Sequence, residues 1–172
     1  ARYSLKTAIA DLGPEGFFFE KWMAKVFQKQ GFDSITSQTL IGEAVSHEID
    51  IVASKHKELL FCECKFRNDH ESKISVPIPM AFLSRYNDLK SKTFSFFGKE
   101  LKATSGFLIT NAYFTSDSIA FSEYYGLHLI SWNYPPENNL KLFADRLGMY
   151  PITSLTTIND EQKKLLLNKN CI

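Results

Sequence analysis

The chain has 172 residues, of which 44% are hydrophobic and 14% aromatic, and its formal net charge is +1. This composition excludes a disordered chain and fits one globular domain with a core of its own. The near-neutral charge neither indicates nor excludes a nucleic-acid partner, because such binding needs only a local basic patch. No apolar run is long enough to span a bilayer and no signal peptide is visible, so we expect no membrane partner.

A helix and three strands are predicted in the first part of the chain. Gly13-Pro14 opens a helical stretch that runs to about Gln30 and stops at Gly31. Four of its apolar positions share one face: Phe17, Met23, Ala24 and Phe27. Strands follow over residues 33–40, 47–54 and 58–65. Lys55-His56-Lys57 forms the turn that joins the last two strands into a hairpin.

The remaining elements alternate in the same way and end in short helices. They are a helix at about 79–92, a strand at 106–110, a helix from about 115 to Gly126, a strand at 127–132, and helices at about 138–148 and 160–168. Thr157 and Asp160 have the spacing of a capping box for the last helix. The order α-β-β-β-α-β-α-β predicts an α/β fold, with a mixed central sheet flanked by helices and short C-terminal helices. We divide the chain into a core, 1–136, and a helical tail, 137–172.

The three cysteines indicate a reducing compartment, and we therefore expect a cytoplasmic protein. Cys62 and Cys64 lie one residue apart on one strand, where they cannot easily form a disulfide with each other. A structural zinc site would need four ligands, and only Cys171 remains. We therefore interpret Cys62 and Cys64 as residues of the core.

Charged residues interrupt two of the predicted strands. Side chains alternate faces along a strand, so Glu63 and Lys65 share one face of residues 58–65. On the neighbouring strand, the same alternation predicts Glu48, Asp50 and Val52 on one face. It predicts Ile49, Ile51 and Ala53 on the opposite face. If the two strands pair, Asp50 lies near Glu63 and Lys65. Glu20 lies on the apolar stripe of the first predicted helix.

These charged residues have a chemical interpretation. Buried unpaired charge is costly, and two close carboxylates repel each other unless a proton or a metal ion separates them. Mg²⁺ prefers oxygen ligands and would satisfy Asp50 and Glu63 together. Lys65 would orient a water molecule or stabilise a developing negative charge, which suits hydrolysis of a phosphodiester. The alternative is an ion pair between Lys65 and one of the acids at a sheet edge. With Glu20 added from a separate element, we favour the metal site.

The order and spacing of these residues resemble the signature of the PD-(D/E)xK nucleases, and most closely the Mrr-like restriction endonuclease domain. Members read G-x-x-x-E on a first helix, Asp at the end of a second strand and (D/E)-x-K on a third. This chain has FEKWMAKVFQKQGF, HEIDIV and FCECKFRN in that order. The later GFLITN and FTSDSIAFSEYYGLHLISW also match, so the resemblance covers residues 13–132. The departure is Ile49, which stands where the signature has Pro.

The start of the chain bears a second resemblance. YSLKTAIADLGPEGFFFE is similar to the junction that follows an ATP-cone module in some bacterial relatives of the family. No ATP-cone stands in this sequence, so we predict no ATP binding for it. The chain begins with Ala1-Arg2-Tyr3 rather than Met, which leaves open an upstream domain that precedes it in a longer protein.

The resemblance implies a restriction-endonuclease-like core and a Mg²⁺-dependent DNA endonuclease of the restriction type, in which Mn²⁺ can substitute. Asp50, Glu63 and the main-chain carbonyl of Cys64 would bind the metal. Lys65 would position the attacking water, and Glu20 would act through a water. The 3′-oxygen would leave, which gives 5′-phosphate ends. We hypothesise a homodimer, because a domain with one site needs two copies or two visits to cut both strands.

Other residues are weaker candidates. Arg67, just beyond the motif, and Arg85, on the second predicted helix, are possible contacts to a DNA phosphate. Glu48 shares a face with Asp50 and could assist metal binding, but a solvated strand end explains Glu48 and His47 more simply. Asn111 ends a strand near the site and either shapes it or forms a turn.

Two rival functions stay open. Archaeal Holliday-junction resolvases share this core and motif order, so branched DNA is an alternative substrate. Cleavage of a four-way junction but not of a duplex would favour it. A DNA-binding or interaction module that no longer cuts is the second rival, and binding without cleavage across several divalent metals would support it. No sequence feature rejects RNA, and none defines the target site or a dependence on methylation.

Overall fold

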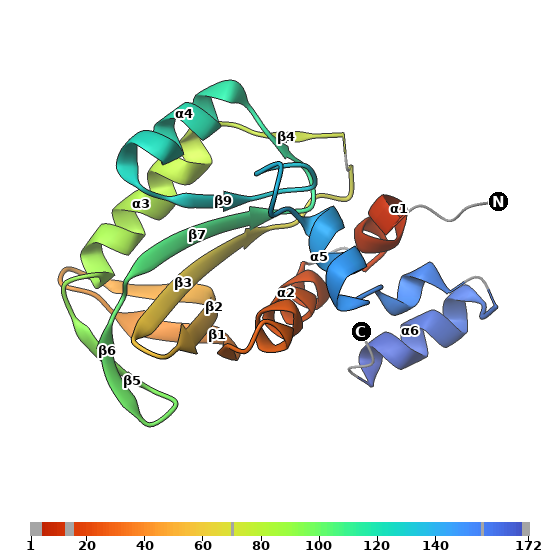
Figure 1. The fold of residues 1–172 in the computed structure, drawn as a ribbon, viewed down its shortest axis with the longest axis horizontal. Coiled ribbons are helices and arrows are strands. Elements are labelled where there is room, and N and C mark those ends of the chain that lie inside the picture. The colour runs from red at the N-terminus through yellow and green to blue at the C-terminus, as the bar shows by residue number, and fades with distance from the viewer. Residues whose placement is uncertain (1–4, 13–15, 70, 156, 170–172) are drawn as a thin grey trace.

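The computed structural model describes residues 5–12, 16–69, 71–155 and 157–169. Its centre is a five-stranded mixed sheet with the strand order β1-β2-β3-β7-β9 (Figure 1). The strands are β1 (Asp33–Ile41), β2 (Ser46–Lys55), β3 (Glu58–Lys65), β7 (Ser105–Thr110) and β9 (His128–Ile130). β2 is antiparallel to both β1 and β3, whereas β7 is parallel to β3 and β9 is parallel to β7. The antiparallel and parallel halves of the sheet therefore meet at β3.

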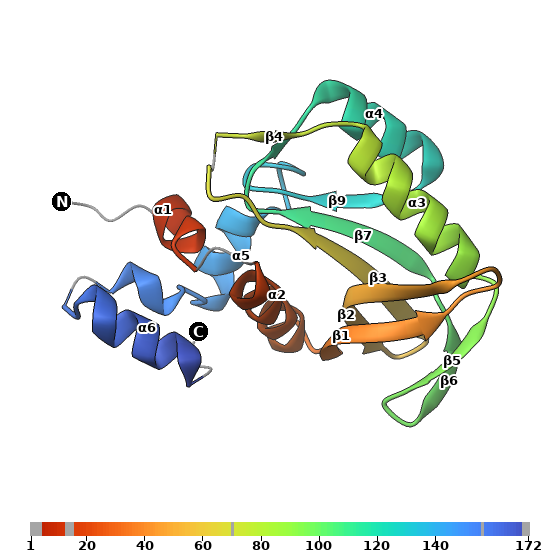
Figure 2. The ribbon, with the colours of Figure 1, turned by 180° about the vertical axis from the view of Figure 1, so that it is seen from behind.

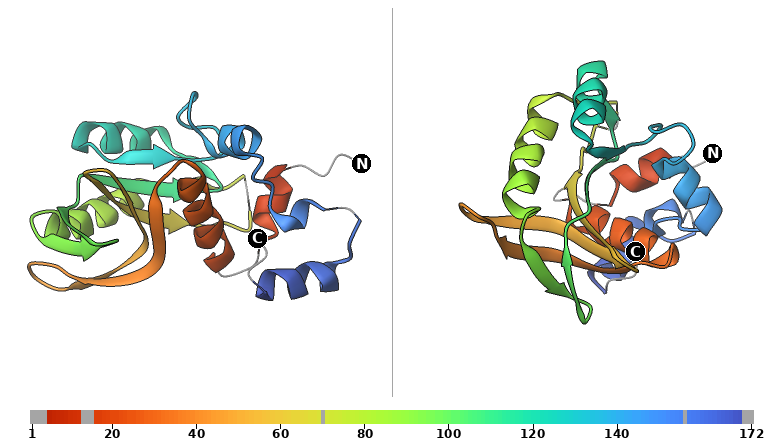
Figure 3. Two further views of the ribbon diagram at one scale, coloured as in Figure 1. Left: turned by 60° about the horizontal axis from the view of Figure 1, so that its bottom comes forward. Right: turned by 60° about the vertical axis from the view of Figure 1, so that its left-hand side comes forward.

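Helices cover both faces of this sheet (Figures 2 and 3). One face carries α1 (Leu5–Ala10), α2 (Phe17–Lys29) and α5 (Leu140–Leu147), and the other carries α3 (Pro77–Leu89) and α4 (Ser116–Tyr125). Alternate residues of β3 supply both cores. Leu60 and Cys62 pack on the α2 side, whereas Leu59 and Phe61 pack on the α3 side. The predicted α/β fold with a mixed sheet flanked by helices is confirmed.

In the described residues, four short strands lie outside the central sheet. β4 (Lys73–Ile74) pairs with β8 (Tyr113–Phe114), while β5 (Thr93–Phe96) and β6 (Lys99–Lys102) form a hairpin that projects beyond the sheet (Figure 1). A short helical turn, η1 (Ile152–Ser154), precedes the last helix, α6 (Asp160–Asn168). None of the short strands is among the predicted elements, because each has only two or four residues and no room for a periodic pattern.

Most predicted elements are present, with local corrections. The bounds of β3 and α6 are those predicted, and α4 lies between the expected caps, Thr115 and Gly126. α2 begins at Phe17, and residues 13–15 lie outside the described ranges. Phe17 is 44% exposed, so its predicted place on the buried face is wrong. Its ring lies instead against Lys21 Nζ, 4.0 Å from the ring centroid.

The C-terminal helices show one further correction. The capping box of α6 consists of Asn159 and Gln162, whose side chains each accept a main-chain N–H of the other, and not of Thr157 and Asp160. α5 packs into the main core on the α2 side through three residues: Leu140, Phe143 and Ala144. The division of the chain at residue 136 stays a prediction.

The first hairpin is irregular at Asp50, and this irregularity shapes the site. The position opposite Asp50 in the β1–β2 register is Ser37, which has a left-handed φ of 54°. Strand pairing between β2 and β3 reaches only Ile51, opposite Cys62. Ile49 packs with Val52 on the α3 side, whereas Ile51 packs on the α2 side. The predicted alternation is therefore wrong at Ile49, because the strand does not continue regularly through Asp50.

Candidate active site

Five charged side chains from four elements come together near this irregularity. Glu20 belongs to α2, Asp50 to β2, Glu63 and Lys65 to β3, and Arg85 to α3. The sequence predicted the first four as one group, and it predicted Arg85 separately, as a possible contact to a DNA phosphate. The arrangement depends on β3, whose C-terminal half carries two of these residues between β2 and β7.

Glu63 is the most buried of the five, with 3% of its side chain exposed. Its Oε1 pairs with Lys65 Nζ, and also with Arg85 Nη2 at 2.6 Å. The ion pair that was the structural alternative for Lys65 is therefore present. However, Glu63 Oε2 is buried and has no hydrogen-bond partner within the described part of the chain. A buried carboxylate oxygen without a partner is costly, so a structural ion pair alone does not account for Glu63.

Asp50 is held by the main chain of β3. Its Oδ2 accepts the N–H of Cys64 at 2.6 Å, in place of a regular ladder contact between the strands. Burial, and after it the charge of Glu63, raise the pKa of Asp50 to about 6, although the Cys64 N–H opposes the shift. The negative charge of Asp50 therefore lacks full compensation in the protein itself.

Glu20 adds a third acid from the other side of the sheet. Burial, and after it the charges of Asp50, Glu48 and Glu63, raise the pKa of Glu20 to about 7, while Lys65 opposes the shift. Glu48 itself is exposed at the rim. Acids whose pKa values are raised by one another favour a proton or an added cation between them.

The chain just after the motif is fixed by the end of β7. Thr110 Oγ1 donates to the carbonyl of Lys65 at 2.6 Å. Asn111 Oδ1 accepts the N–H of Arg67 at 2.7 Å, and Asn111 Nδ2 donates to the carbonyl of Arg67 at 2.7 Å. Asn111 therefore holds the exit of β3, which is the shaping role that was one of its two interpretations. The Arg67 guanidinium donates to the neighbouring Phe66 carbonyl at 3.1 Å.

The donor set fits a hard divalent cation better than a soft one. Within the described ranges, no group of three or more His, Cys, Asp or Glu side chains is arranged to hold a metal ion. The set that the resemblance implies has only two such side chains, together with a main-chain oxygen. The hydrogen bond and ion pairs described above use one oxygen of each carboxylate, Oδ2 of Asp50 and Oε1 of Glu63. The buried second oxygen of Glu63 is the observation that supports a cation there.

Several other interpretations can now be assigned. Cys62 and Cys64 are buried free thiols in the core, as predicted, whereas Cys171 lies outside the described residues. The solvated interpretation of His47 is wrong, because its Nε2 contacts Asp88 Oδ2 at 2.7 Å and 12% of its side chain is exposed. The role of Asp88 was not predicted. The one indication in the sequence was an acidic residue near the end of a predicted helix.

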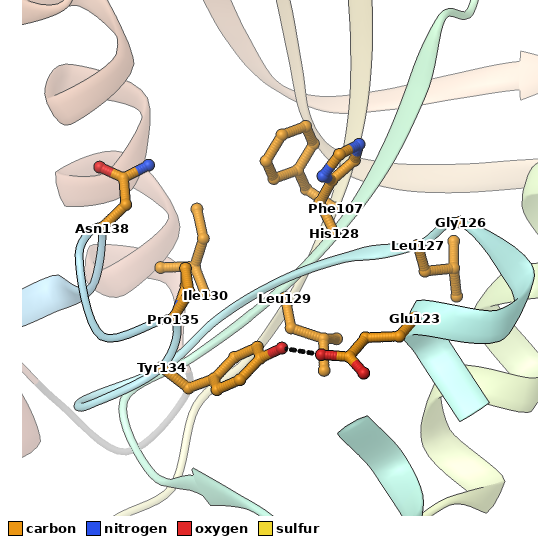
Figure 4. Close-up of a pocket in the computed structure, with 10 residues that line it drawn as sticks. All are labelled: Phe107, Glu123, Gly126, Leu127, His128, Leu129, Ile130, Tyr134, Pro135 and Asn138. Atoms are coloured by element: carbon orange, nitrogen blue, oxygen red, sulfur yellow. Dashed lines mark hydrogen bonds between the residues drawn. The ribbon is translucent and has the colours of Figure 1, made fainter. Parts of the chain in front are cut away.

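A pocket of about 480 Å³ lies elsewhere, along β9 (Figure 4). Tyr134 Oη donates to Glu123 Oε1 at 2.5 Å on one side of the strand, and His128 stacks on Phe107 on the other. Its one carboxylate is already engaged, and none of the five charged residues lines it. We therefore place the candidate chemistry at the charged cluster.

Comparisons with known proteins identify a family for the part of the chain that carries these residues. A family model described as Restriction endonuclease, with the short name Mrr_cat, matches residues 13–133. An uncharacterized protein of Archaeoglobus fulgidus is 27% identical over 139 residues, which cover 77% of this chain and 71% of that protein. The crystal structure of a protein of unknown function, AF1548, is 26% identical, with a TM-score of 0.75 over 90% of this chain and 78% of its own.

A more distant solved structure is the MspJI restriction endonuclease in complex with a 27-mer oligonucleotide. It is 14% identical, with a TM-score of 0.46 over 94% of this chain and 38% of its own. In the described ranges, every helix is too short or too polar to cross a membrane.

Proposed function

Because the chain belongs to the Mrr-like restriction endonuclease domains of the PD-(D/E)xK superfamily, we propose that it is a metal-dependent endonuclease that hydrolyses phosphodiester bonds in DNA. The observation that carries the proposal is the buried Oε2 of Glu63, which has no partner in the described chain although two cations pair with Oε1. A core that needed only an ion pair would not leave that oxygen unsatisfied.

Asp50 and Glu63, together with the main-chain carbonyl of Cys64, would hold Mg²⁺ or Mn²⁺. When bound, the ion would supply Lewis acidity toward the phosphate and offset the repulsion among the acids. Glu20 would contribute through a water, because its carboxylate comes from a different element and is partly exposed.

The cations of the site would act on the phosphate itself. Lys65 has 31% of its side chain exposed, so its ammonium can reach solvent and orient an attacking water while it pairs with Glu63. Arg85 has 30% exposed, and its guanidinium has donors beyond the one on Glu63 for a phosphate oxygen. Arg67 would contact a neighbouring phosphate. The negative charge that develops on the phosphate would thus meet fixed positive charge.

The test is cleavage of supercoiled plasmid and of a four-way junction across a Mg²⁺ or Mn²⁺ titration. Asp50→Ala and Lys65→Ala should abolish cutting and stay folded, whereas Lys141→Ala, on the exposed face of α5, should cut as the natural chain does. Cutting by Asp50→Ala at the natural rate would refute the assignment. Cleavage of the junction alone would favour a resolvase. Binding without cleavage under every metal would favour a non-cutting module.

Two further parts of the proposal concern substrate and assembly. An RNA duplex of the same sequence should resist cleavage if DNA is the substrate. We propose a homodimer, because double-strand cuts by a domain with one site need two copies or two visits. Light scattering during size-exclusion chromatography should give twice the mass of 19.7 kDa, and a mass of one chain would count against the dimer.

A further inference from the structure

The loop between β1 and β2 is clasped to the end of α3, and Asp88 is the centre of the contact. Its Oδ1 accepts the N–H of Ala44 at 2.9 Å, and its Oδ2 accepts the N–H of Val45 at 3.3 Å. His47 Nε2 contacts the same Oδ2 at 2.7 Å. The main-chain carbonyl of Asp88 accepts the N–H of Glu43 at 2.9 Å. One residue of α3 therefore binds three consecutive loop residues, Glu43, Ala44 and Val45, and also His47 near the start of β2.

Other contacts tighten the same clasp. Lys92 Nζ donates to the carbonyl of Gly42 at 3.2 Å, and Ser91 Oγ donates to Glu43 Oε1 at 2.7 Å. A Cβ on Gly42 would lie 2.0 Å from Asp88 Oδ2, so only glycine allows this approach. These hydrogen bonds join the loop and the start of β2 to the C-terminal end of α3.

Arg85 lies three residues before Asp88, on the same side of α3. Its Nη2 pairs with Glu63 Oε1 at 2.6 Å, and its Nη1 reaches the carbonyl of Glu48 at 3.5 Å. Thus β2 touches the same helix face twice in succession, through Glu48 at Arg85 and through His47 at Asp88. The clasp at Asp88 and the charged cluster at Arg85 therefore lie on adjacent turns of α3, where this helix contacts β2.

We propose that His47 and Asp88 are positioning residues of the active site, which hold α3 against β2 so that Arg85 stays on Glu63. The effect on cleavage rests on the proposed function, whereas the effect on the order of Arg85 does not. An arginine side chain has several rotatable bonds, so its place on Glu63 depends on a fixed helix. A displacement of about 1 Å near a reacting centre can lower a rate by up to about a hundredfold.

A purely structural clasp predicts something different. It would lower stability when broken and would leave cleavage by the folded protein unchanged. The two explanations separate in a double-mutant cycle, because a residue that acts through Arg85 has nothing left to act on once Arg85 is removed.

The experiment compares single-turnover DNA cleavage by Asp88→Asn, Arg85→Met and the double variant, at a temperature at which circular dichroism shows all of them folded. We expect Asp88→Asn to slow cleavage by about tenfold and the double variant to cut no more slowly than Arg85→Met alone. Asp145→Asn is the matched control, because Asp145 also accepts a hydrogen bond, from Tyr150, and belongs to α5, which supplies none of the five charged residues. It should cut at the natural rate.

A second measurement does not need activity. The ¹⁵Nε–H signal of Arg85, assigned by its loss in Arg85→Met, should broaden or shift in Asp88→Asn and in His47→Gln but not in Asp145→Asn. An unchanged signal in Asp88→Asn would overturn the proposal, as would multiplicative rate losses in the double variant. If the natural chain cuts no DNA, the proposed function fails, and the Arg85 signal alone decides on the clasp.

Discussion

Replacement of Glu20 by Gln should stabilise the metal-free protein near neutral pH, although Glu20 belongs to the candidate site. Burial, together with the charges of the neighbouring acids, raises the pKa of Glu20 from 4.5 to about 7. The native state therefore holds this proton more tightly than the unfolded chain does. Stability is then lost as the pH rises through the window from 4.5 to about 7, because the unfolded state binds fewer protons than the native state there.

The magnitude follows from the same values. The full difference would correspond to about 3 kcal/mol at a pH above 7, at about 1.4 kcal/mol per pKa unit. Glu20 is partly exposed, so solvent screening reduces the expected gain for Glu20→Gln to about 1–2 kcal/mol. In a chain of this size each kcal/mol shifts the melting temperature by about 2–4 °C, so we expect an increase of about 2–8 °C.

Thermal unfolding followed by circular dichroism, with a chelator present, measures this change. The gain should be present at about pH 8 and several times smaller at about pH 5, where native Glu20 is already protonated. Mg²⁺ at about pH 8 should narrow the difference, because a cation offsets the repulsion that the Gln removes. Glu100→Gln on the exposed face of β6 is the control and should change neither value. A variant that is less stable than the natural chain at about pH 8 would refute the reasoning, since Glu20 would then hold a favourable contact.

Three further predictions concern packing and reactivity. Gly42→Ala should lower the free energy of unfolding in urea by about 1–3 kcal/mol, because the added Cβ would lie 2.0 Å from Asp88 Oδ2. Gly98→Ala is the control: its Cβ would meet open space, so it should cost only about 1 kcal/mol for the positive φ of Gly98. A larger loss for Gly98→Ala than for Gly42→Ala would contradict the clasp. Asn111→Ala should cost about 1–3 kcal/mol, since it removes both hydrogen bonds to the Arg67 main chain, and the exposed Asn138→Ala is its control. Cys62 and Cys64 should resist iodoacetamide until the protein is unfolded, because burial raises the pKa of both thiols; modification of either in the native state, seen by peptide mass spectrometry, would show that the core opens.

Periodicity predicted much of the sheet, and the alternation on β3 grouped most of the site. Residues 58–65 carry an uninterrupted strand pattern, so Glu63 and Lys65 were placed on one face, and the hairpin turn brought Asp50 to them. The irregularity at Asp50 was not predictable in this way. Ser37 adopts a left-handed conformation without a glycine or asparagine to signal it, and the side of Ile49 follows from that.

Contacts between distant elements were the part that sequence could not predict. Arg85 reaches Glu63, and Asp88 reaches His47, only because α3 crosses β2 at one particular place. Neither the periodicity of a helix nor the alternation of a strand predicts where those two elements meet. Asn111 is a similar case, because an asparagine after a strand is equally compatible with a turn and with the clamp on Arg67 that the structure contains.

The position of β3 also determines the order in which the site can be completed during synthesis. Its antiparallel partner β2 precedes it directly along the chain, but its parallel partner β7 follows only after α3 and the β5–β6 hairpin. Pairing across such a long connection forms slowly compared with a hairpin. We therefore expect a chain still emerging from the ribosome to bring Asp50 and Glu63 together before Thr110 and Asn111 are present to fix the end of the strand. The acids assemble early and their geometry is fixed late, so a partly synthesised chain would carry the motif without the fixed strand end that the proposed reaction requires.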